Sequence, residues 1–246
     1  MPQRASGAFA IRLDPPHCAQ GSSGEVALAA EVAQLPLSQL VESGRLVWAP
    51  MAAEAEELGY WLLQVVSVSV SGHGILQNCT GERGSGCLAA VDTGTGDVMG
   101  PQASVNRLLA LLDVKEDCAL DKLPSIEFKI QGFDDRMLSL SLTAADYIDK
   151  TDGFCDASIS VMDMPPEKPQ VWVLGQPLLR KYVSVYDVKN RKVGFGLASH
   201  VQGDDTSGPS PVQDLPDANS FLQSAQNSGF KVVSERKMRL RARDRE

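Results

Sequence analysis

The sequence predicts an all-β protein with a few short helices. Apolar and polar residues alternate in short segments such as Ile126–Ile130 and Met137–Leu142, which is the pattern of half-buried strands. Tyr60–Val70 is rich in aromatic and β-branched residues, which favour strands. Glycine and proline interrupt these segments at short intervals. Many short strands with few helices are typical of a β-sandwich or a barrel-like lobe.

Taken in order, the strands are separated by turn residues. Phe9–Leu13 ends at Asp14-Pro15-Pro16, where proline removes a backbone donor. Glu25–Val32 is rich in alanine, and its pattern fits a strand or a helix. Ser71–Gly74 is expected to turn the chain into Ile75–Leu76 and so make a hairpin. The other strands that we expect are Arg45–Trp48, Leu88–Val91, Val171–Leu174, Val183–Asp187 and Lys192–Leu197.

Helices are expected at three places in the first 200 residues. Leu35–Ser43 and Thr143–Ile148 each predict a short helical segment. Gln102–Val114 predicts a longer helix, because its apolar residues recur at spacings of three and four. Those apolar residues are Val105, Leu108, Leu109 and Leu112.

Residues 1–200 are expected to form one lobe, and residues 201–246 a linker followed by a disordered basic tail. Gly203–Ser210 is rich in Gly, Asp, Ser and Pro, a linker composition. Asp217 is placed to cap one helix over 217–227. The last 16 residues hold seven basic and three acidic residues, and we expect a solvated chain end there rather than a binding patch.

Composition and charge narrow the classes of function. The 246 residues are 43% hydrophobic and 22% charged, which is ordinary for a globular protein. A formal net charge of −8 argues against nucleic acid as the main partner. No apolar run approaches the length of a membrane span. Phe9–Leu13 is too short and too interrupted to be the core of a signal peptide.

The five cysteines predict disulfide bonds rather than a metal site. None are spaced as Cys-x-x-Cys, and the three histidines lie near no cysteine pair. Two disulfide bonds with one cysteine left over fit the count, and they imply an oxidising compartment. We therefore expect no metal ion.

The segment around Asp92 is the one most suggestive of chemistry. The apolar run Leu88–Val91 leads into Asp92-Thr93-Gly94-Thr95-Gly96. Glycine permits a tight turn, and threonine hydroxyls can hydrogen-bond a carboxylate. The alternative is an aspartate that only ends a strand through an Asx turn. A nucleotide-binding loop does not fit, because no Walker-type lysine follows Gly96.

Several sequence motifs occur in a fixed order along the chain. They are Gly44–Pro50, Gly59–Trp61, Cys87–Thr95, Gly100-Pro101, Leu123–Phe128, Trp172–Gly175, Leu179–Tyr182 and Val185–Asp187. Over about residues 9–198 this series resembles the C-terminal lobe of the pepsin-like aspartic proteases. One Asp-Thr-Gly is a weak signal, whereas this ordered series is a strong one. The resemblance implies a single lobe of the bilobal, barrel-like acid protease fold and an aspartic-type endopeptidase.

The resemblance also implies roles for individual residues. In that family two aspartates share a proton, so that one activates water as a general base and the other polarises the peptide carbonyl. Asp92 matches the second catalytic aspartate of the pair. Thr93 matches the residue that locks the active-site loops of the two lobes together, and Thr95 the one whose hydroxyl bonds the carboxylate. Met162 and Met164 match positions in the substrate cleft, with core packing as the alternative.

Disulfide pairings, partners and location follow from the same resemblance. Cys79 is expected to pair with Cys87 and Cys118 with Cys155, which leaves Cys18 unpaired. The family uses no cofactor and acts on peptide or protein substrates. Its members imply a secretory, endomembrane or extracellular location.

Three departures from the family pattern bear on activity. The sequence contains one Asp-Thr-Gly and no second Asp-Thr/Ser-Gly, so the N-terminal lobe that carries the first aspartate in the family has no counterpart here. Gly96 stands where serine is usual, which removes a hydroxyl near the substrate. Gln176 stands where aspartate is common, and the loss of that carboxylate predicts a less acidic pH optimum.

Three functions remain open from the sequence. The chain is one lobe of a pepsin-like endopeptidase and is inactive alone. Alternatively, it is a single-lobe protease that dimerises, so that Asp92 meets its copy. The third possibility is a non-catalytic lobe that binds peptides or proteins.

Overall fold

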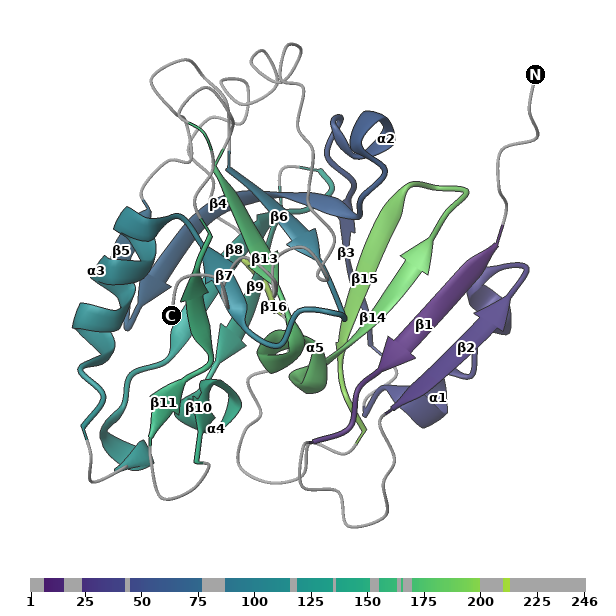
Figure 1. The fold of residues 1–246 in the computed structure, drawn as a ribbon. Helices are drawn as coiled ribbons and strands as arrows, with labels where there is room; N and C mark the ends of the chain where they lie inside the picture. The colour runs from purple at the N-terminus through teal and green to yellow at the C-terminus, as the bar shows by residue number, and fades with distance from the viewer. Residues whose placement is uncertain are drawn as a thin grey trace, which may run out of the picture.

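The computed structural model describes residues 7–15, 24–42, 45–76, 87–115, 119–134, 136–150, 155–162, 165, 170–199 and 210–212. These residues form mostly β-strands with a few short helices, so the all-β prediction is confirmed. Two main sheets make up the fold. Figure 1 shows β1, β2, β14 and β15 side by side on one side of the molecule and the larger sheet on the other.

The smaller main sheet is antiparallel and has five strands. In spatial order these are β2 (Glu25–Ala29), β1 (Ala8–Arg12), β14 (Tyr182–Asp187), β15 (Lys192–Leu197) and β3 (Val47–Pro50). Alternate side chains point to opposite faces. Val183 and Val185 pack with Leu40 in a small apolar cluster, whereas Tyr182 and Tyr186 belong to the main core. Pairing with β1 makes Glu25–Ala29 a strand, which its alanine-rich sequence alone did not decide.

The larger sheet has nine strands. In order these are β12 (Ile159–Val161), β7 (Val98–Gly100), β13 (Val171–Leu174), β6 (Cys87–Val91), β4 (Leu62–Val70), β8 (Ile126–Gln131), β9 (Met137–Leu142) and β16 (Ser210–Val212), with β5 (His73–Leu76) paired to β4. The predicted hairpin joins β4 to β5, with Ser71 and Gly72 as its two-residue turn. β13 runs parallel to β6, and β12 parallel to β7. Parallel pairing brings the carboxyl ends of β6 and β13 to the same end of the sheet.

The helices of the described residues are short, and one of them is longer than two turns. They are η1 (Val32–Gln34), α1 (Leu37–Leu40), α2 (Ala55–Leu58), α3 (Gln102–Leu112), η2 (Leu120–Lys122), α4 (Ala144–Tyr147) and α5 (Gln176–Lys181), with β10 (Ile148–Asp149) and β11 (Asp156–Ala157) forming a separate two-stranded sheet. In α3, Val105, Leu108 and Leu112 are buried as the spacing predicts, but Leu109 is 36% exposed. Helix α5 was not predicted from the sequence; it carries Pro177 in its first turn, where a missing N–H is tolerated.

The main apolar core takes side chains from both sheets, including Tyr186 and Phe195 from the smaller one. The rings of Phe128 and Trp172 meet edge to face, with their centroids 5.5 Å apart. Gly100 lies against this pair, because a Cβ there would sit 2.5 Å from an indole carbon of Trp172. The glycine of the Gly100-Pro101 motif is thus required by packing.

Beyond residue 200 the structure describes one short segment. Ser210–Val212 forms β16, which pairs antiparallel with β9. Its composition does not predict a strand, since the pairing depends on residues some 70 positions earlier. The helix expected over 217–227 lies outside the described residues. In the described part of the chain, none of the helices has the length and hydropathy needed to cross a membrane.

Candidate active site

Asp92 lies where two parallel strands end side by side. Every residue of β6 and of β13 is buried. The Asp92 N–H donates to the carbonyl oxygen of Leu174 at the end of β13, with 3.2 Å between N and O. One residue earlier, the Val91 N–H donates to the carbonyl oxygen of Trp61 at 3.0 Å. These bonds hold the backbone on both sides of the point where the carboxylate emerges.

The two carboxylate oxygens of Asp92 have separate donors. The Gly94 N–H donates to Oδ1 at 2.9 Å, and the Thr95 hydroxyl donates to Oδ2 at 2.7 Å. The first bond is the Asx-turn bond that a strand-ending aspartate would make. The second fixes the other oxygen as well, and Thr95 is only 5% exposed. Asp92 itself is half-buried, so its carboxylate is oriented by the protein and still within reach of solvent.

A second segment, at the end of β13, supports this loop. The Gln176 N–H donates to the Thr95 carbonyl oxygen at 2.8 Å. A Cβ on Gly175 would lie 2.0 Å from the Asp97 carbonyl oxygen and 2.6 Å from that of Thr95, so only glycine fits there. The strand end and the loop are therefore in direct backbone contact.

Helix α5 places a cation behind the loop. The Gln176 side-chain amide donates to the Thr93 carbonyl oxygen at 3.5 Å, and Arg180 donates to Gln176 Oε1 at 2.7 Å. Burial lowers the pKa of Arg180, and the negative charge of Asp149 acts in the opposite direction. Gln176, noted in the sequence as a departure from the family pattern, thus links a guanidinium to the backbone of Thr93.

An aromatic cluster of Phe9, Trp61 and Tyr186 lies beside Asp92. Phe9 stacks on Tyr186 with ring centroids 4.4 Å apart, and Trp61 meets Tyr186 edge to face at 4.8 Å. Burial raises the pKa of Tyr186 to about 12, and the charge of Asp92 contributes to the rise. Sequence reasoning missed Tyr186 as a neighbour of Asp92. The alternating pattern of its strand predicted that the Tyr186 side chain is buried, but it did not predict which residues surround that side chain.

Of the other residues singled out in the sequence, some are among the described residues and some are not. Met162 is half-buried, packs beside an apolar cluster on the larger sheet, and donates its N–H to the Gly100 carbonyl oxygen at 2.7 Å. Met164 lies outside the described residues. Cys87 and Cys155 are each disulfide-bonded. Because Cys18, Cys79 and Cys118 lie outside the described residues, the pairings stay predictions.

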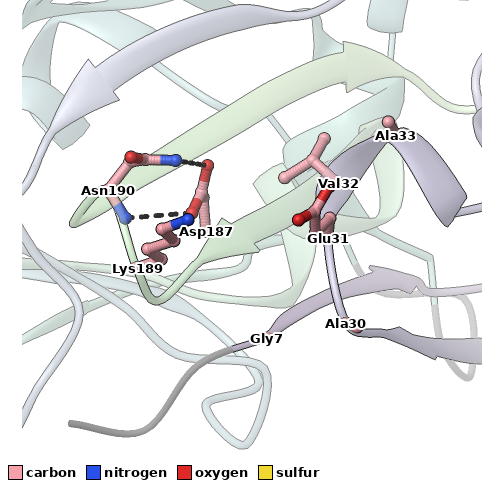
Figure 2. Close-up of a pocket in the computed structure, with 8 residues that line it drawn as sticks. All are labelled: Gly7, Ala30, Glu31, Val32, Ala33, Asp187, Lys189 and Asn190. Atoms are coloured by element: carbon pink, nitrogen blue, oxygen red, sulfur yellow. Dashed lines mark hydrogen bonds between the residues drawn. The ribbon is translucent and has the colours of Figure 1, made fainter.

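A pocket of about 260 Å³ lies elsewhere, at the turn between β14 and β15. Figure 2 shows its lining, with the backbone and side-chain nitrogens of Asn190 both bonded to Asp187. Asp187 follows Tyr186 on β14, so its side chain points to the opposite face of the sheet. The residues that line the pocket are Gly7, Ala30, Glu31, Val32, Ala33, Asp187, Lys189 and Asn190. None of them belongs to the Asp92 loop.

Within the described ranges, no group of three or more His, Cys, Asp or Glu side chains is close enough to hold a metal ion.

The arrangement around Asp92 defines a class of site. A carboxylate whose two oxygens are held by different donors, on a loop between two buried strand ends, is suited to acid–base chemistry. Comparison with known families agrees, because the model of the eukaryotic aspartyl proteases matches residues 38–198, which include the whole Asp92 loop. The chain belongs to the eukaryotic aspartyl protease family.

Individual relatives are similar over part of their length. Cathepsin E of Aquarana catesbeiana is 33% identical over 162 residues, which cover 62% of this chain and 37% of the relative. Pepsin A of Bos taurus is 30% identical over 162 residues, covering 62% and 40%. Gastricsin of Macaca fuscata fuscata is 30% identical over 190 residues, covering 73% and 45%. The chain thus spans about two-fifths of the length of the curated relatives it matches.

Proposed function

We propose that the chain is the C-terminal lobe of an aspartic-type endopeptidase and that Asp92 is one of its two catalytic carboxylates. The observation that carries the proposal is the double anchoring of Asp92 by Gly94 and Thr95, inside the segment that matches the protease family. In this proposal residues 1–200 form the lobe, to which β16 (Ser210–Val212) adds a strand, and the rest of residues 201–246 forms a linker and tail.

The proposed chemistry needs a second carboxylate. Two close aspartates cannot both ionise, so they share a proton, and the aspartic proteases are the standard example of this coupling. The ionised member takes a proton from water, the water oxygen attacks the peptide carbonyl carbon, and the protonated member donates to the carbonyl oxygen. Since the sequence holds one Asp-Thr-Gly, the second aspartate comes from outside these 246 residues or from a second copy. The isolated monomer is then inactive.

The neighbouring residues have supporting roles in this proposal. Thr95 and Gly94 orient the carboxylate, and Thr93 meets the equivalent loop of the other lobe. Gly96 is exposed, and among the described residues other than its two chain neighbours no atom lies within 4 Å of the place a Cβ would occupy, so the loop leaves room for substrate there. Met162 and Met164 contact the bound peptide. The disulfide pairs Cys79–Cys87 and Cys118–Cys155 fit a secretory, endomembrane or extracellular location.

A second copy of the chain is the alternative source of the other aspartate, and one observation favours it. β2 is the last strand at one side of the five-stranded sheet in the described residues. Its Val26 is 62% exposed and its Leu28 is 80% exposed. Exposed apolar side chains on an edge strand are typical of a surface that pairs with another chain.

The test is cleavage of an internally quenched apolar peptide between about pH 3 and 7 by a concentrated sample, in which copies can associate. We expect any cleavage to disappear in Asp92→Asn and to persist in Asp156→Asn, which removes an exposed carboxylate on β11. Cleavage that survives Asp92→Asn contradicts the proposal. Peptide binding that is equal in the wild type and Asp92→Ala, with no cleavage at any concentration, indicates a non-catalytic binding lobe instead.

A further inference from the structure

Four side chains form a small surface beside the Asp92 loop, which we call the β7–β12 patch: Asp97, Met99, Ser160 and Met162. β7 and β12 pair in parallel, with Met99 opposite Ser160. Met99 and Met162 both pack beside the same apolar cluster. The intervening Val98 and Ile159 point the other way, into the main core. The four residues of the patch are all half-buried, so each presents part of its surface to solvent.

Asp97 gives the patch a negative charge. Its carboxylate accepts a hydrogen bond from the Ser160 hydroxyl, which ties the end of the Asp92 loop to β12. Its carbonyl oxygen lies against Gly175, beside that of Thr95, so Asp97 is at the base of the same loop. Among the ion pairs between described residues, none involves Asp97. The charge is therefore oriented by a neutral hydroxyl and is not neutralised by a neighbouring cation of the described chain.

The two methionines give the patch an apolar part. Their thioether side chains lie over a cluster that includes Leu62, Leu88 and Val171. Unbranched methionine side chains adapt to the shape of what they contact. The patch thus combines adaptable apolar surface with a fixed carboxylate. Lysine and arginine have the complementary shape, because each has an apolar stem and a cationic tip.

We propose that the β7–β12 patch is a specificity site that receives a lysine or arginine side chain of the substrate peptide. The stem lies along Met99 and Met162, and the cation meets the carboxylate of Asp97. The inference rests on the proposed function, because it concerns the peptide that the Asp92 site acts on. An apolar side chain of equal length gains the methionine contacts but not the ion pair.

Binding of labelled peptides tests the inference without requiring turnover. The probes are fluorescein-labelled apolar octapeptides that carry a single lysine, placed at each position in turn, and matched peptides with norleucine at that position. Fluorescence anisotropy at neutral pH measures the Kd of each for the 246-residue chain. At one position the lysine peptide is expected to bind about threefold to fivefold more tightly, the size of a partly exposed ion pair. The preference should shrink in high salt.

The variants separate charge from shape. Asp97→Asn should abolish the lysine preference and leave the norleucine peptide's Kd unchanged, whereas Asp156→Asn should leave the preference intact. Peptide binding with no lysine preference at any position, or with a preference that Asp97→Asn retains, overturns the inference and leaves the proposed function standing. A lysine preference without any cleavage supports the patch and leaves the proposed function standing, because the isolated lobe is expected to be inactive. Failure of every peptide to bind overturns the inference, whereas the proposed function is tested separately by the effect of Asp92→Asn on cleavage.

Discussion

At the scale of single residues, the position of the Asp92 loop depends on the missing side chain of Gly175. The carbonyl oxygens of Thr95 and Asp97 approach where a Cβ would stand, at 2.6 Å and 2.0 Å. Both belong to backbone and cannot rotate away as a side-chain end could. Gly96, four residues after Asp92, provides a contrast, because no described residue beyond its two chain neighbours comes within 4 Å of its Cβ position.

These two glycines make a matched pair for substitution. Gly175→Ala forces backbone apart at the base of the loop and is expected to lower the free energy of unfolding by about 2–4 kcal/mol, in the range of strained or overpacked sites. Gly96→Ala is expected to change it by less than about 0.5 kcal/mol. Urea unfolding followed by circular dichroism measures both. Equal stabilities of the two variants would show that the loop does not depend on this close approach.

Residues close in sequence to Asp92 could be predicted to support it, and distant ones could not. Thr95 is three positions from Asp92 in the sequence, so the motif Asp92-Thr93-Gly94-Thr95 itself indicates the hydrogen bond from the Thr95 hydroxyl to the carboxylate. Tyr186 and Gln176 reach the site through the pairing of β14 and the end of β13. The sequences around these two residues do not indicate that either lies next to the Asp92 loop. For Gln176 the only signal was the resemblance to the family.

At the scale of elements, helices α4 and α5 are joined by a buried ion pair. Lys181 is 2% exposed, and its Nζ lies 3.0 Å from Asp146 Oδ2. The same carboxylate oxygen accepts hydrogen bonds from the backbone and hydroxyl of Thr143, which caps α4. Since α5 also carries Gln176 and Arg180, this pair fixes the helix that supports the Asp92 loop.

Removing one charge of this pair should cost more than removing the other. Asp146→Asn keeps an oxygen for the Thr143 cap but leaves the buried ammonium without its carboxylate, and we expect a loss of about 2–4 kcal/mol in the free energy of unfolding. Lys181→Met fills the same space and leaves a carboxylate that is 17% exposed and still capped, with an expected loss of about 1 kcal/mol or less. Thermal and urea unfolding of both variants measure which one loses more free energy of unfolding. A larger loss for Lys181→Met would contradict this description of the pair.

Element types were easier to predict than element ends and short helices. The alternating strands β8, β9, β14 and β15 carry their own period, and the structure has them within a residue or two of the expected ranges. α5 was missed because six residues beginning Gln-Pro show no helical period, and tertiary packing of Leu178 and Leu179 decides it. β16 was missed because its partner strand, not its composition, makes it a strand.

At the scale of the whole molecule, the Asp92 loop is supported by two sheets, and apolar surface continues away from it. Phe9 and Trp61 beside Asp92 are half-buried, and Phe9 pairs with the exposed Leu28 across β1 and β2. The similarity to Pepsin A of Bos taurus extends over 40% of that protein's length. These observations agree with a lobe whose active site is completed by another lobe or another copy.

The dependence of the cleavage rate on protein concentration shows whether the Asp92 site needs a second carboxylate from outside the monomer. The initial rate on a quenched apolar peptide is measured from dilute to concentrated chain, with and without a statine-type transition-state inhibitor, and with added Asp92→Asn protein. We expect no inhibitor-sensitive cleavage by the dilute monomer. Any activity at high concentration should rise with the square of concentration and fall when the variant is mixed in. An inhibitor-sensitive rate that is proportional to concentration down to the dilute monomer would contradict this expectation, since Asp92 would then act without a second carboxylate.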